Sequence, residues 1–339
     1  MPTAAVFDCE GPRMSAEEKA FFRDVDPWGF IVFARHCQSA DALRAHCDEL
    51  REAVGREDAP ILIDQEGGRV ARMAPPAFPK HPAPAVFGEL WRLDPAKAKE
   101  AARLNARLLG RMASDCGVTL NCVPMLDVPQ IDADPAVIGD RAIARHPEII
   151  AALGAEAVAG SLEGGALPVI KHLPGHGRSL CDSHHDLPRI AAPKEDLRAT
   201  DFPPFRALRD APLGMTGHLV FEAYDDARCA TLSPVVIEEV VRGEIGFDGL
   251  LFTDDLKMKA LRGPLDARIS GAYAAGCDVA CCCNFTMDEK NEAGPALRPL
   301  DGRAGARAAA ALALLAPVER DDVAAHYERL DALLKPALA

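Results

Sequence analysis

The sequence lacks the features that would place the protein in a membrane or on a nucleic acid. No apolar run approaches the ~20 residues that a bilayer-spanning helix needs. The opening residues, MPTAAVFDCE, contain no basic region followed by an apolar run, so we expect no signal peptide. The formal net charge of −13 argues against a nucleic-acid-binding surface. We therefore expect an unexported protein with neither a membrane nor a nucleic-acid partner.

Several motifs of cofactor binding and catalysis are also missing. No G-x-G-x-x-G, P-loop or G-x-S-x-G occurs in the right context, so nucleotide binding and serine hydrolysis lose support. The eleven cysteines have no paired C-x-x-C spacing, which disfavours a metal cluster. In an unexported chain we expect these cysteines to be reduced, buried and inert. We expect neither a metal nor an organic cofactor.

Composition and pattern predict one large α/β domain. The chain has 339 residues, of which 49% are hydrophobic and 26% charged, enough for a large core. Short apolar runs alternate with amphipathic helical stretches, and no repeat or break in composition interrupts them. The apolar runs predict eight strands, at residues 4–8, 29–33, 60–64, 118–123, 168–172, 214–218, 249–253 and 278–283.

Helical stretches separate these strands, and two more follow the last one. They lie at residues 15–25, 41–54, 95–114, 147–162, 194–209, 234–245, 265–275, 304–315 and 321–334. The alternation predicts a single (β/α)8 TIM-type barrel over residues 1–339, with C-terminal helices and no second domain. The weakest helical pattern is 15–25, between the first two strands. The longest irregular stretches, 74–87 and 124–145, follow strands and are candidate functional loops.

Polar residues gather where the predicted strands end. They are Asp64, Asp127, Lys171, His172, His218, Asp254 and Asp255. On a barrel these ends converge on one mouth, where active sites form. A single such residue would suit a cap or a solvated rim, but seven at five strand ends favour a site of chemistry.

The stretch 171–188, KHLPGHGRSLCDSHHDLP, holds four of the ten histidines. Asp182 and His184 stand two apart, so the carboxylate can accept a hydrogen bond from the imidazole and raise the basicity of its other nitrogen. This pair would make a general acid/base near neutral pH. The alternative is an ordinary turn in which Asp182 and Ser183 bond to their own backbone. His185 would project elsewhere.

Two further patterns in this stretch have competing interpretations. His172 and His176 have the spacing of zinc ligands on a helix, but the intervening Pro174 and Gly175 exclude helical geometry and no H-E-x-x-H is present. Lys171 and His172 end a buried strand and are therefore expected to hold a polar substrate. A structural ion pair inside the barrel is the alternative for Lys171.

Carboxylates and arginines follow other strands. By strand alternation we expect one of Asp254 and Asp255 to point into the mouth and the other away. An inward carboxylate could be a nucleophile, a base or a metal ligand, or part of a structural ion pair. The stretch from Asp64 to Arg72, DQEGGRVAR, could clamp a ligand bearing hydroxyl and amide groups. Arg141 in the next loop could bind such a ligand in the same way. Solvated turns are the alternative for both.

These residues together resemble a known family. KHLPGHGRSLCDSHHDLP resembles the signature of the bacterial β-N-acetylhexosaminidases of glycoside hydrolase family 3, the NagZ type. IDQEGGRVARM, NCVPMLDV, VIGDR and GFDGLLFTDDLKM resemble the family's other blocks in the same order. Leu173 and Ala142 depart from the usual Phe and Ser. Neither carries the chemistry.

The resemblance implies a cytoplasmic (β/α)8 enzyme of peptidoglycan recycling. It would release N-acetylglucosamine from the non-reducing end of fragments that contain 1,6-anhydro-N-acetylmuramic acid, with or without peptide. By motif position, Asp254 corresponds to the nucleophile, His184 to the general acid/base and Asp182 to its partner. The substrate-binding positions fall on Asp64, Arg72, Arg141, Lys171 and His172. The partner is then a small carbohydrate, and we expect a monomer.

The resemblance also implies a mechanism. Asp254 would form a covalent glycosyl-enzyme while His184 protonates the leaving oxygen, and His184 would then activate water, with the β configuration retained. Two other functions stay open on the same residues. One is transfer of the sugar to phosphate or to another sugar, and the other is sugar binding without catalysis, against which the complete set of Asp182, His184 and Asp254 argues.

Overall fold

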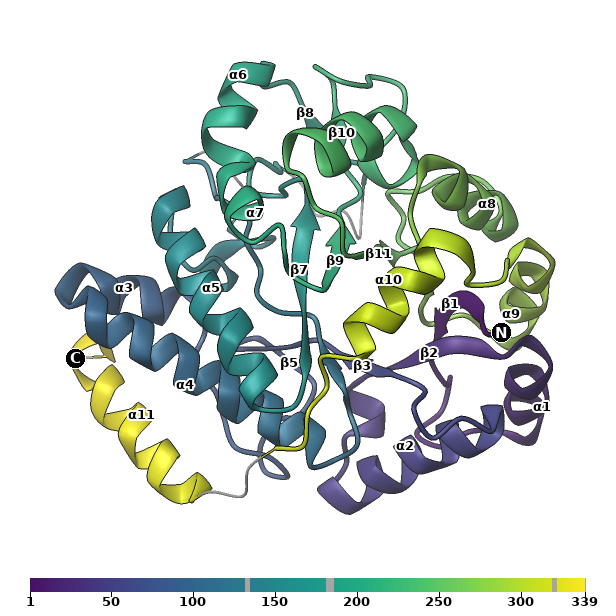
Figure 1. Cartoon of the computed structure of the whole chain (residues 1–339), viewed down its shortest axis with the longest axis horizontal. Coiled ribbons are helices and arrows are strands. Elements are labelled where there is room, and N and C mark those ends of the chain that lie inside the picture. Colours follow the sequence, from purple (N-terminus) through teal and green to yellow (C-terminus); the bar gives the residue numbers. More distant parts are fainter. Residues whose placement is uncertain (132–134, 181–185, 319–321, 339) are drawn as a thin grey trace.

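A closed barrel of parallel strands forms the centre of the molecule, and helices surround it (Figure 1). This computed structural model describes residues 1–131, 135–180, 186–318 and 322–338. The hydrogen-bonded order around the barrel is β1-β12-β11-β9-β7-β6-β3-β2, so the last strand pairs with the first. Each neighbouring pair in this order is parallel. The (β/α)8 fold expected from the sequence is confirmed.

The barrel strands occupy the eight predicted positions with shifted ends. They are β1 (Thr3–Phe7), β2 (Pro27–Val32), β3 (Ile61–Ile63), β6 (Leu120–Asn121), β7 (Leu167–Leu173), β9 (Leu213–Thr216), β11 (Leu250–Asp255) and β12 (Val279–Cys282). The strand predicted at 118–123 is reduced to β6, which pairs at both residues with β7 and β3. Two small sheets lie outside the barrel, β4 (Gln65–Gly67) with β5 (Val70–Ala71) and β8 (Arg189–Ile190) with β10 (Val220–Phe221).

The helices form the outer layer. They are α1 (Ala16–Val25), α2 (Ala40–Val54), α3 (Ala85–Leu93), α4 (Pro95–Ser114), α5 (Pro147–Glu163), α6 (Lys194–Asp196), α7 (Pro203–Ala207), α8 (Leu265–Ala275), α9 (Met287–Ala293), α10 (Gly302–Leu312) and α11 (Val323–Leu338). The uninterrupted helix expected at 194–209 is instead α6, a π-helical turn over Leu197–Asp201, and α7. The helix expected at 234–245 is largely π-helical, over Val236–Glu244.

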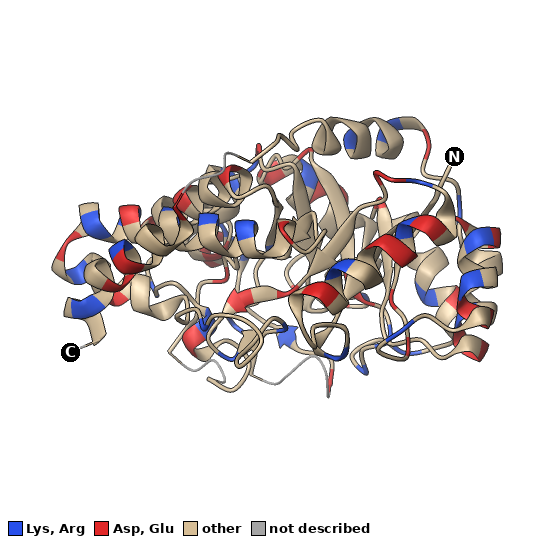
Figure 2. Ribbon diagram, turned by 90° about the horizontal axis from the view of Figure 1, so that it is seen from below, with Lys and Arg blue, Asp and Glu red and all other residues tan. Residues whose placement is uncertain are grey.

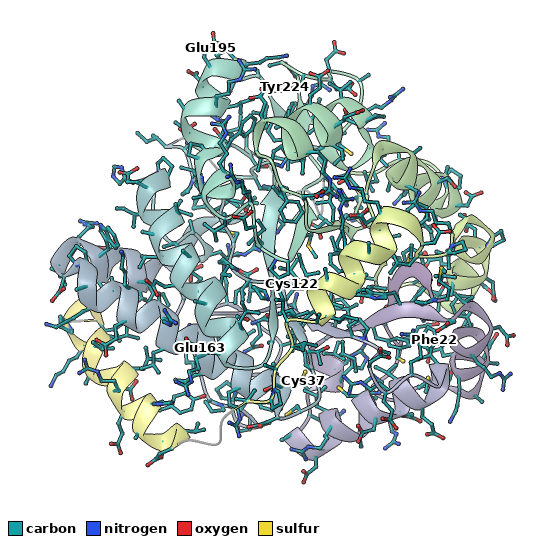
Figure 3. The ribbon with its side chains drawn as sticks, viewed as in Figure 1. Phe22, Cys37, Cys122, Glu163, Glu195 and Tyr224 are labelled. Atoms are coloured by element: carbon teal, nitrogen blue, oxygen red, sulfur yellow. The ribbon has the colours of Figure 1, made fainter. Side chains whose placement is uncertain are left out.

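The connection between β1 and β2 contains the helix whose pattern was weakest. Ser15 begins α1 with a capping box, in which its hydroxyl accepts from the Glu18 amide at 3.1 Å and Glu18 accepts from the Ser15 amide at 2.9 Å. Phe21 and Phe22 then turn inward and are buried. Both stack edge-on against neighbouring rings, and Phe22 is labelled beside α1 in Figure 3. Local capping and aromatic burial together fix this short helix.

Apolar side chains fill the barrel, and charged residues cover it. Figure 2 shows Lys, Arg, Asp and Glu spread over the outer helices, while the central strands are mostly uncharged. The described cysteines are free and buried, among them Cys122, labelled near the middle of Figure 3. Burial raises the pKa of the Cys37 thiol to about 12 and that of Cys229 to about 11, so both stay protonated. Within the described residues, no helix is long and apolar enough to cross a bilayer.

Candidate active site

A hollow of about 400 Å³ opens at the carboxyl ends of the barrel strands. We call it the mouth. Asp127 and His218 do not line it, whereas the described residues that the family resemblance assigns to the site all do, namely Asp64, Arg72, Arg141, Lys171, His172 and Asp254. They come from β7 and β11 and from the connections after β3, β5 and β6, so the barrel brings together residues up to 190 positions apart, from 64 to 254. Asp182 and His184 lie outside the described residues, and their roles remain predictions.

Lys171 is the centre of a buried charge network. Its ammonium lies 2.8 Å from an Asp64 oxygen and 2.7 Å from a Glu66 oxygen, and only 2% of the residue is exposed. Burial alone would lower the pKa of Lys171, but the two carboxylates outweigh it and raise the pKa. Burial acts the opposite way on Asp64 and Glu66, whose pKa values nevertheless fall because of Lys171 and the neighbouring arginines. All three groups are therefore charged at neutral pH.

Two arginines complete this network in different ways. Arg141 donates to both carboxylate oxygens of Glu66, from Nε at 2.9 Å and from Nη2 at 2.8 Å, in the paired geometry typical of a strong ion pair. Arg72 makes one long contact to Asp64, at 3.4 Å, and its buried Nε has no hydrogen-bond partner among the described residues. Arg141 is thus held by the protein, whereas Arg72 keeps donors available for a ligand.

His172 is oriented by a buried carboxylate. Its Nδ1 lies 2.7 Å from Asp127, which also accepts from the backbone amides of His172 and His176 at 3.2 and 2.6 Å. Burial would raise the pKa of Asp127, but His172 and these hydrogen bonds lower it, so the carboxylate stays ionised. An ionised partner keeps the proton on Nδ1 and leaves Nε2 as the nitrogen for other contacts.

Asp254 and Asp255 both line the mouth, which corrects the expectation that one would point away. The pairing of β11 with β12 shifts register between Phe252 and Asp255, and such a bulge breaks the strict alternation of side chains. Burial would raise the pKa of Asp254, but His218, His172 and the Asp255 amide lower it. Burial and the Asp254 charge raise the pKa of Asp255 to about 7. The two adjacent carboxyls therefore differ in protonation at neutral pH.

His218 does not line the mouth but lies behind Asp255, where it makes hydrogen bonds to neighbouring loops. It is fully buried, with Nδ1 at 2.7 Å from the Thr231 hydroxyl and Nε2 at 3.0 Å from the Asp255 carbonyl oxygen. Burial lowers the pKa of His218, and its two ring nitrogens join the loops that contain Thr231 and Asp255. Its place near Asp254 agrees with the predicted convergence of strand ends.

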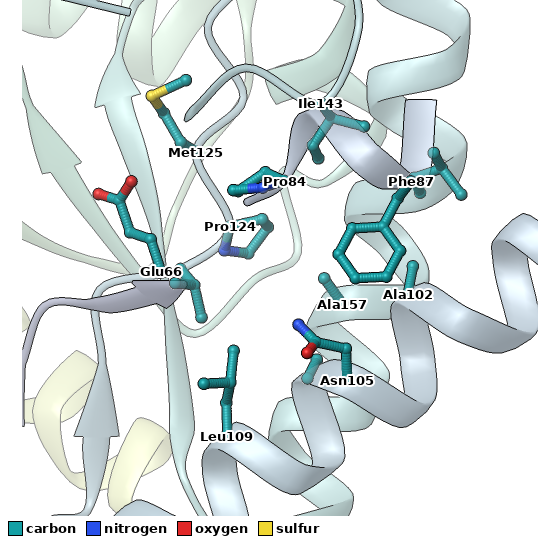
Figure 4. Close-up of a pocket in the computed structure, with 13 residues that line it drawn as sticks. Glu66, Pro84, Phe87, Ala102, Asn105, Leu109, Pro124, Met125, Ile143 and Ala157 are labelled. Carbon is teal, nitrogen blue, oxygen red and sulfur yellow. The ribbon is translucent and has the colours of Figure 1, made fainter. Parts of the chain in front are cut away.

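Behind one wall of the mouth lies a second, apolar cavity of about 50 Å³ (Figure 4). Phe87 from α3 and Ala102 and Leu109 from α4 line it, and Glu66 belongs to both the cavity and the mouth. An apolar backing lowers the local dielectric around Glu66, which strengthens its bonds to Lys171 and Arg141.

Sequence reasoning gave no individual role to Glu66 or Asp127, which the structure joins to the site residues. Glu66 stood within the stretch after β3, and Asp127 was noted only as a polar strand end. Their importance follows from contacts to Lys171, Arg141 and His172, which spacing along the chain does not reveal. Polarity next to the predicted ligand residues was the only signal in the sequence.

The arrangement suits a polar, uncharged ligand. Asp64 and Glu66 contribute two negative charges and Lys171, Arg72 and Arg141 three positive charges, which leaves an excess of one positive charge beside Asp254. Paired donors and acceptors of this kind can bind hydroxyl and amide groups. Among the described side chains, no group of three His, Cys, Asp or Glu is placed to hold a metal ion.

Comparison with known proteins agrees with this geometry. The model of the glycosyl hydrolase family 3 N-terminal domain matches residues 3–298. A β-hexosaminidase of Alkalilimnicola ehrlichii is 39% identical over 279 residues, which cover 81% of this chain and 79% of the relative. A β-hexosaminidase of Neisseria gonorrhoeae is 35% identical, over 80% of this chain and 75% of the relative.

The fold comparison extends over the whole chain. The crystal structure of NagZ from Neisseria gonorrhoeae in complex with N-trifluoroacetyl-D-glucosamine has a TM-score of 0.87 and 29% identity, and covers 100% of this chain and 99% of that one. Since the family model spans most of the sequence and the relatives exceed 30% identity over most of their length, this chain belongs to glycosyl hydrolase family 3.

Proposed function

We propose that this β-N-acetylhexosaminidase removes terminal N-acetylglucosamine from the non-reducing end of peptidoglycan fragments. The expected substrate is N-acetylglucosamine linked to 1,6-anhydro-N-acetylmuramic acid, with or without peptide. The reaction would proceed with retention, and the place of action would be the cytoplasm, in cell-wall recycling. We expect the enzyme to act as a monomer without a cofactor.

One observation carries the proposal. The six described residues chosen from sequence motifs line a single hollow in a family 3 barrel, and Asp254 is ionised there. A nucleophilic carboxylate must carry its charge at working pH, and the low pKa of Asp254 meets that requirement. The adjacent Asp255, with a pKa of about 7, is a weaker candidate because much of it is protonated near neutrality.

The proposed chemistry has two steps. Asp254 attacks the anomeric carbon and forms a glycosyl ester as the bond to the leaving oxygen breaks, and His184 gives that oxygen its proton. His184 then accepts a proton from water, whose oxygen attacks the anomeric carbon and releases Asp254. Asp182 would stabilise the imidazolium form of His184. Two inversions at the same carbon return the β configuration.

The charge network would bind the sugar. Asp64 can accept from a hydroxyl, and the partly exposed guanidinium of Arg72 can donate to a hydroxyl or to the acetamido oxygen. Lys171 and Arg141 are fixed by Glu66, so little side-chain entropy is lost when a sugar binds to them. His172 offers Nε2 because Asp127 occupies its other nitrogen.

Asp254→Asn tests the nucleophile. The amide keeps the shape of the side chain but removes the attacking charge, so kcat/KM for an aryl β-N-acetylglucosaminide should fall by at least about 10⁴-fold. The control is Asp210→Asn, a change at an exposed aspartate away from the mouth, which should leave activity unchanged. An Asp254→Asn enzyme with more than a tenth of normal activity would exclude this role.

The substrate is tested with purified cell-wall fragments. Incubation with the anhydro-disaccharide should release free N-acetylglucosamine and the anhydro sugar, detected by mass spectrometry. Release that requires inorganic phosphate, with the sugar recovered as its phosphate, would favour transfer over hydrolysis. Binding of the fragment without any product would favour a sugar-binding protein.

A further inference from the structure

We infer that Arg69 is a positioning residue of the sugar site, because it pins the segment 136–140 from outside the charge network and so places Arg141. We call this segment the Arg69-bound wall. The inference deepens the proposed function and rests on it, since it assigns Arg141 to sugar binding. Arg69 lies in the stretch 64–72 that the sequence singled out, although it was given no role of its own. It lines the mouth, and its hydrogen bonds among the described residues go to the segment 136–140 and not to Glu66 or Lys171.

Arg69 stands at the turn of the small β4–β5 hairpin. Gly67 and Gly68 precede it with φ values of 96° and 58°, a left-handed conformation that glycine adopts without strain. Buried Gln65 locks the hairpin, since its side chain accepts from the Arg72 and Met73 amides at 2.8 and 2.9 Å. The same side chain donates to the Met73 carbonyl at 2.9 Å. The turn is therefore a fixed base for the arginine.

From this base the guanidinium of Arg69 reaches four acceptors within five consecutive residues. Nε lies 3.0 Å from Asp140, Nη1 lies 2.9 Å from the Ala136 carbonyl, and Nη2 lies 3.1 and 3.2 Å from the Val137 and Ile138 carbonyls. A planar group with five donors in a rigid fork can satisfy such a set, whereas an ammonium is a point charge that cannot.

The wall leads directly to Arg141. Asp140 is its neighbour in the chain, and the Val137 carbonyl accepts from Arg141 at 3.3 Å as well as from Arg69. The two arginines thus hold the same carbonyl from two sides, while Arg141 continues to Glu66 with its paired bonds. If the wall shifted, Arg141 could keep its contact with Glu66 only by a change of rotamer.

Two other interactions compete as explanations for the order of the wall. Val137 and Ile138 pack with Met125 and Ala142 in a small apolar cluster. The ion pair of Arg69 with Asp140 leaves their side chains 43% and 50% exposed, so by itself it contributes little. The carbonyl contacts separate the role of Arg69 from these two explanations. If they hold the wall, Arg69→Ala should weaken sugar binding strongly and Asp140→Asn only slightly.

The test measures the dissociation constant of N-acetylglucosamine by NMR titration, together with kcat and KM on an aryl β-N-acetylglucosaminide. Arg69→Ala should raise the dissociation constant and KM about tenfold with little change in kcat, since displacement of a binding group by about 1 Å can cost up to ~100-fold. Arg69→Lys should restore part of the loss. The control Arg92→Ala removes an exposed arginine of α3 that pairs with exposed Glu89, and it should change neither constant.

A double-mutant cycle separates positioning from general damage. If Arg69 acts through Arg141, adding Arg69→Ala to Arg141→Ala should weaken binding by less than about twofold more. An equal loss in both backgrounds, or a loss confined to kcat, would overturn the inference. So would binding by Arg69→Ala within about twofold of the unmodified enzyme.

Hydrogen exchange of the peptide that contains 136–141 tests the pinning without any ligand. Arg69→Ala should speed exchange there, and Asp140→Asn should not, while unchanged exchange in Arg69→Ala would contradict the inference. Failure of the unmodified enzyme to bind or hydrolyse the sugar would instead refute the proposed function, and the exchange result would still decide whether Arg69 holds the wall.

Discussion

At the scale of single residues, the site depends on carboxylates whose protonation is set by their neighbours. Asp254 is kept ionised by His218, His172 and a backbone amide despite burial, while Asp255 next to it has a pKa of about 7. Two adjacent aspartates therefore differ in charge near neutral pH, and only Asp254 is fully available as a nucleophile. The same principle applies to His172, whose available nitrogen is decided by Asp127.

Asp127→Asn tests the orientation of His172. The amide cannot hold the Nδ1 proton as an ionised carboxylate does, so the imidazole should lose its fixed tautomer. We expect kcat/KM to fall on the order of 10- to 100-fold, the loss seen when the carboxylate behind a metal-bound histidine is removed. The melting temperature and the exposed control Asp226→Asn show whether the fold is intact. Activity within twofold of the unmodified enzyme would mean that Asp127 is only structural.

At the scale of elements, the sequence predicted the barrel strands well and their surroundings less well. Buried parallel strands read as short apolar runs, so the eight strands could be located. Both α3 and α9 were missed, because α3 follows a proline-rich stretch and α9 is a short polar helix whose seven residues show little periodicity. The bulge in β11 could not be seen at all, since register depends on the partner strand.

The capping box of α1 gives a prediction at this scale. Ser15→Ala removes the hydroxyl that accepts from the Glu18 amide, and should lower the free energy of unfolding by about 1 kcal/mol. Ser15→Thr keeps a cap oxygen and should recover most of this loss. Urea denaturation measures both. Equal stability of the alanine variant and the unmodified protein would show that packing of Phe21 and Phe22 alone holds the helix.

For the site as a whole, sequence motifs selected residues that line one hollow but did not reveal the network that joins them. Asp64, Lys171 and Arg141 were chosen from spacing and family likeness, and the barrel then placed them together. Glu66, which joins Lys171 to Arg141, was missed because distances between loops are absent from a single sequence. The ion-pair interpretation of Lys171 is confirmed by its contacts with Asp64 and Glu66, and its role as a sugar ligand stays a prediction.

At the scale of the whole molecule, the buried charges couple stability to pH. The pKa of Glu66 is lowered to about 2 from about 4.3 in the unfolded chain. A carboxyl with a depressed pKa stabilises the fold above its unfolded pKa and loses that contribution as pH falls through the folded value. Asp8 and Asp255, with pKa values raised to about 6 and about 7, act in the opposite direction between pH 7 and 4.

Comparison with Glu66→Gln isolates one of these contributions. The difference in unfolding free energy between the unmodified protein and Glu66→Gln should be on the order of 3 kcal/mol larger at pH 6 than near pH 2. It should shrink progressively below pH 5. Urea denaturation over this range measures the difference, and a difference independent of pH would mean that the ionised form of Glu66 adds nothing to stability.

The measurement that tests the account most directly is proton NMR of the first sugar released from an aryl β-N-acetylglucosaminide, with the matching β-glucoside as control. Attack by Asp254 followed by water predicts β-N-acetylglucosamine as the first product, which then mutarotates, and little reaction of the glucoside. An α-anomer as the first product would mean a single inversion. That result would remove the covalent role of Asp254 and contradict the proposed mechanism.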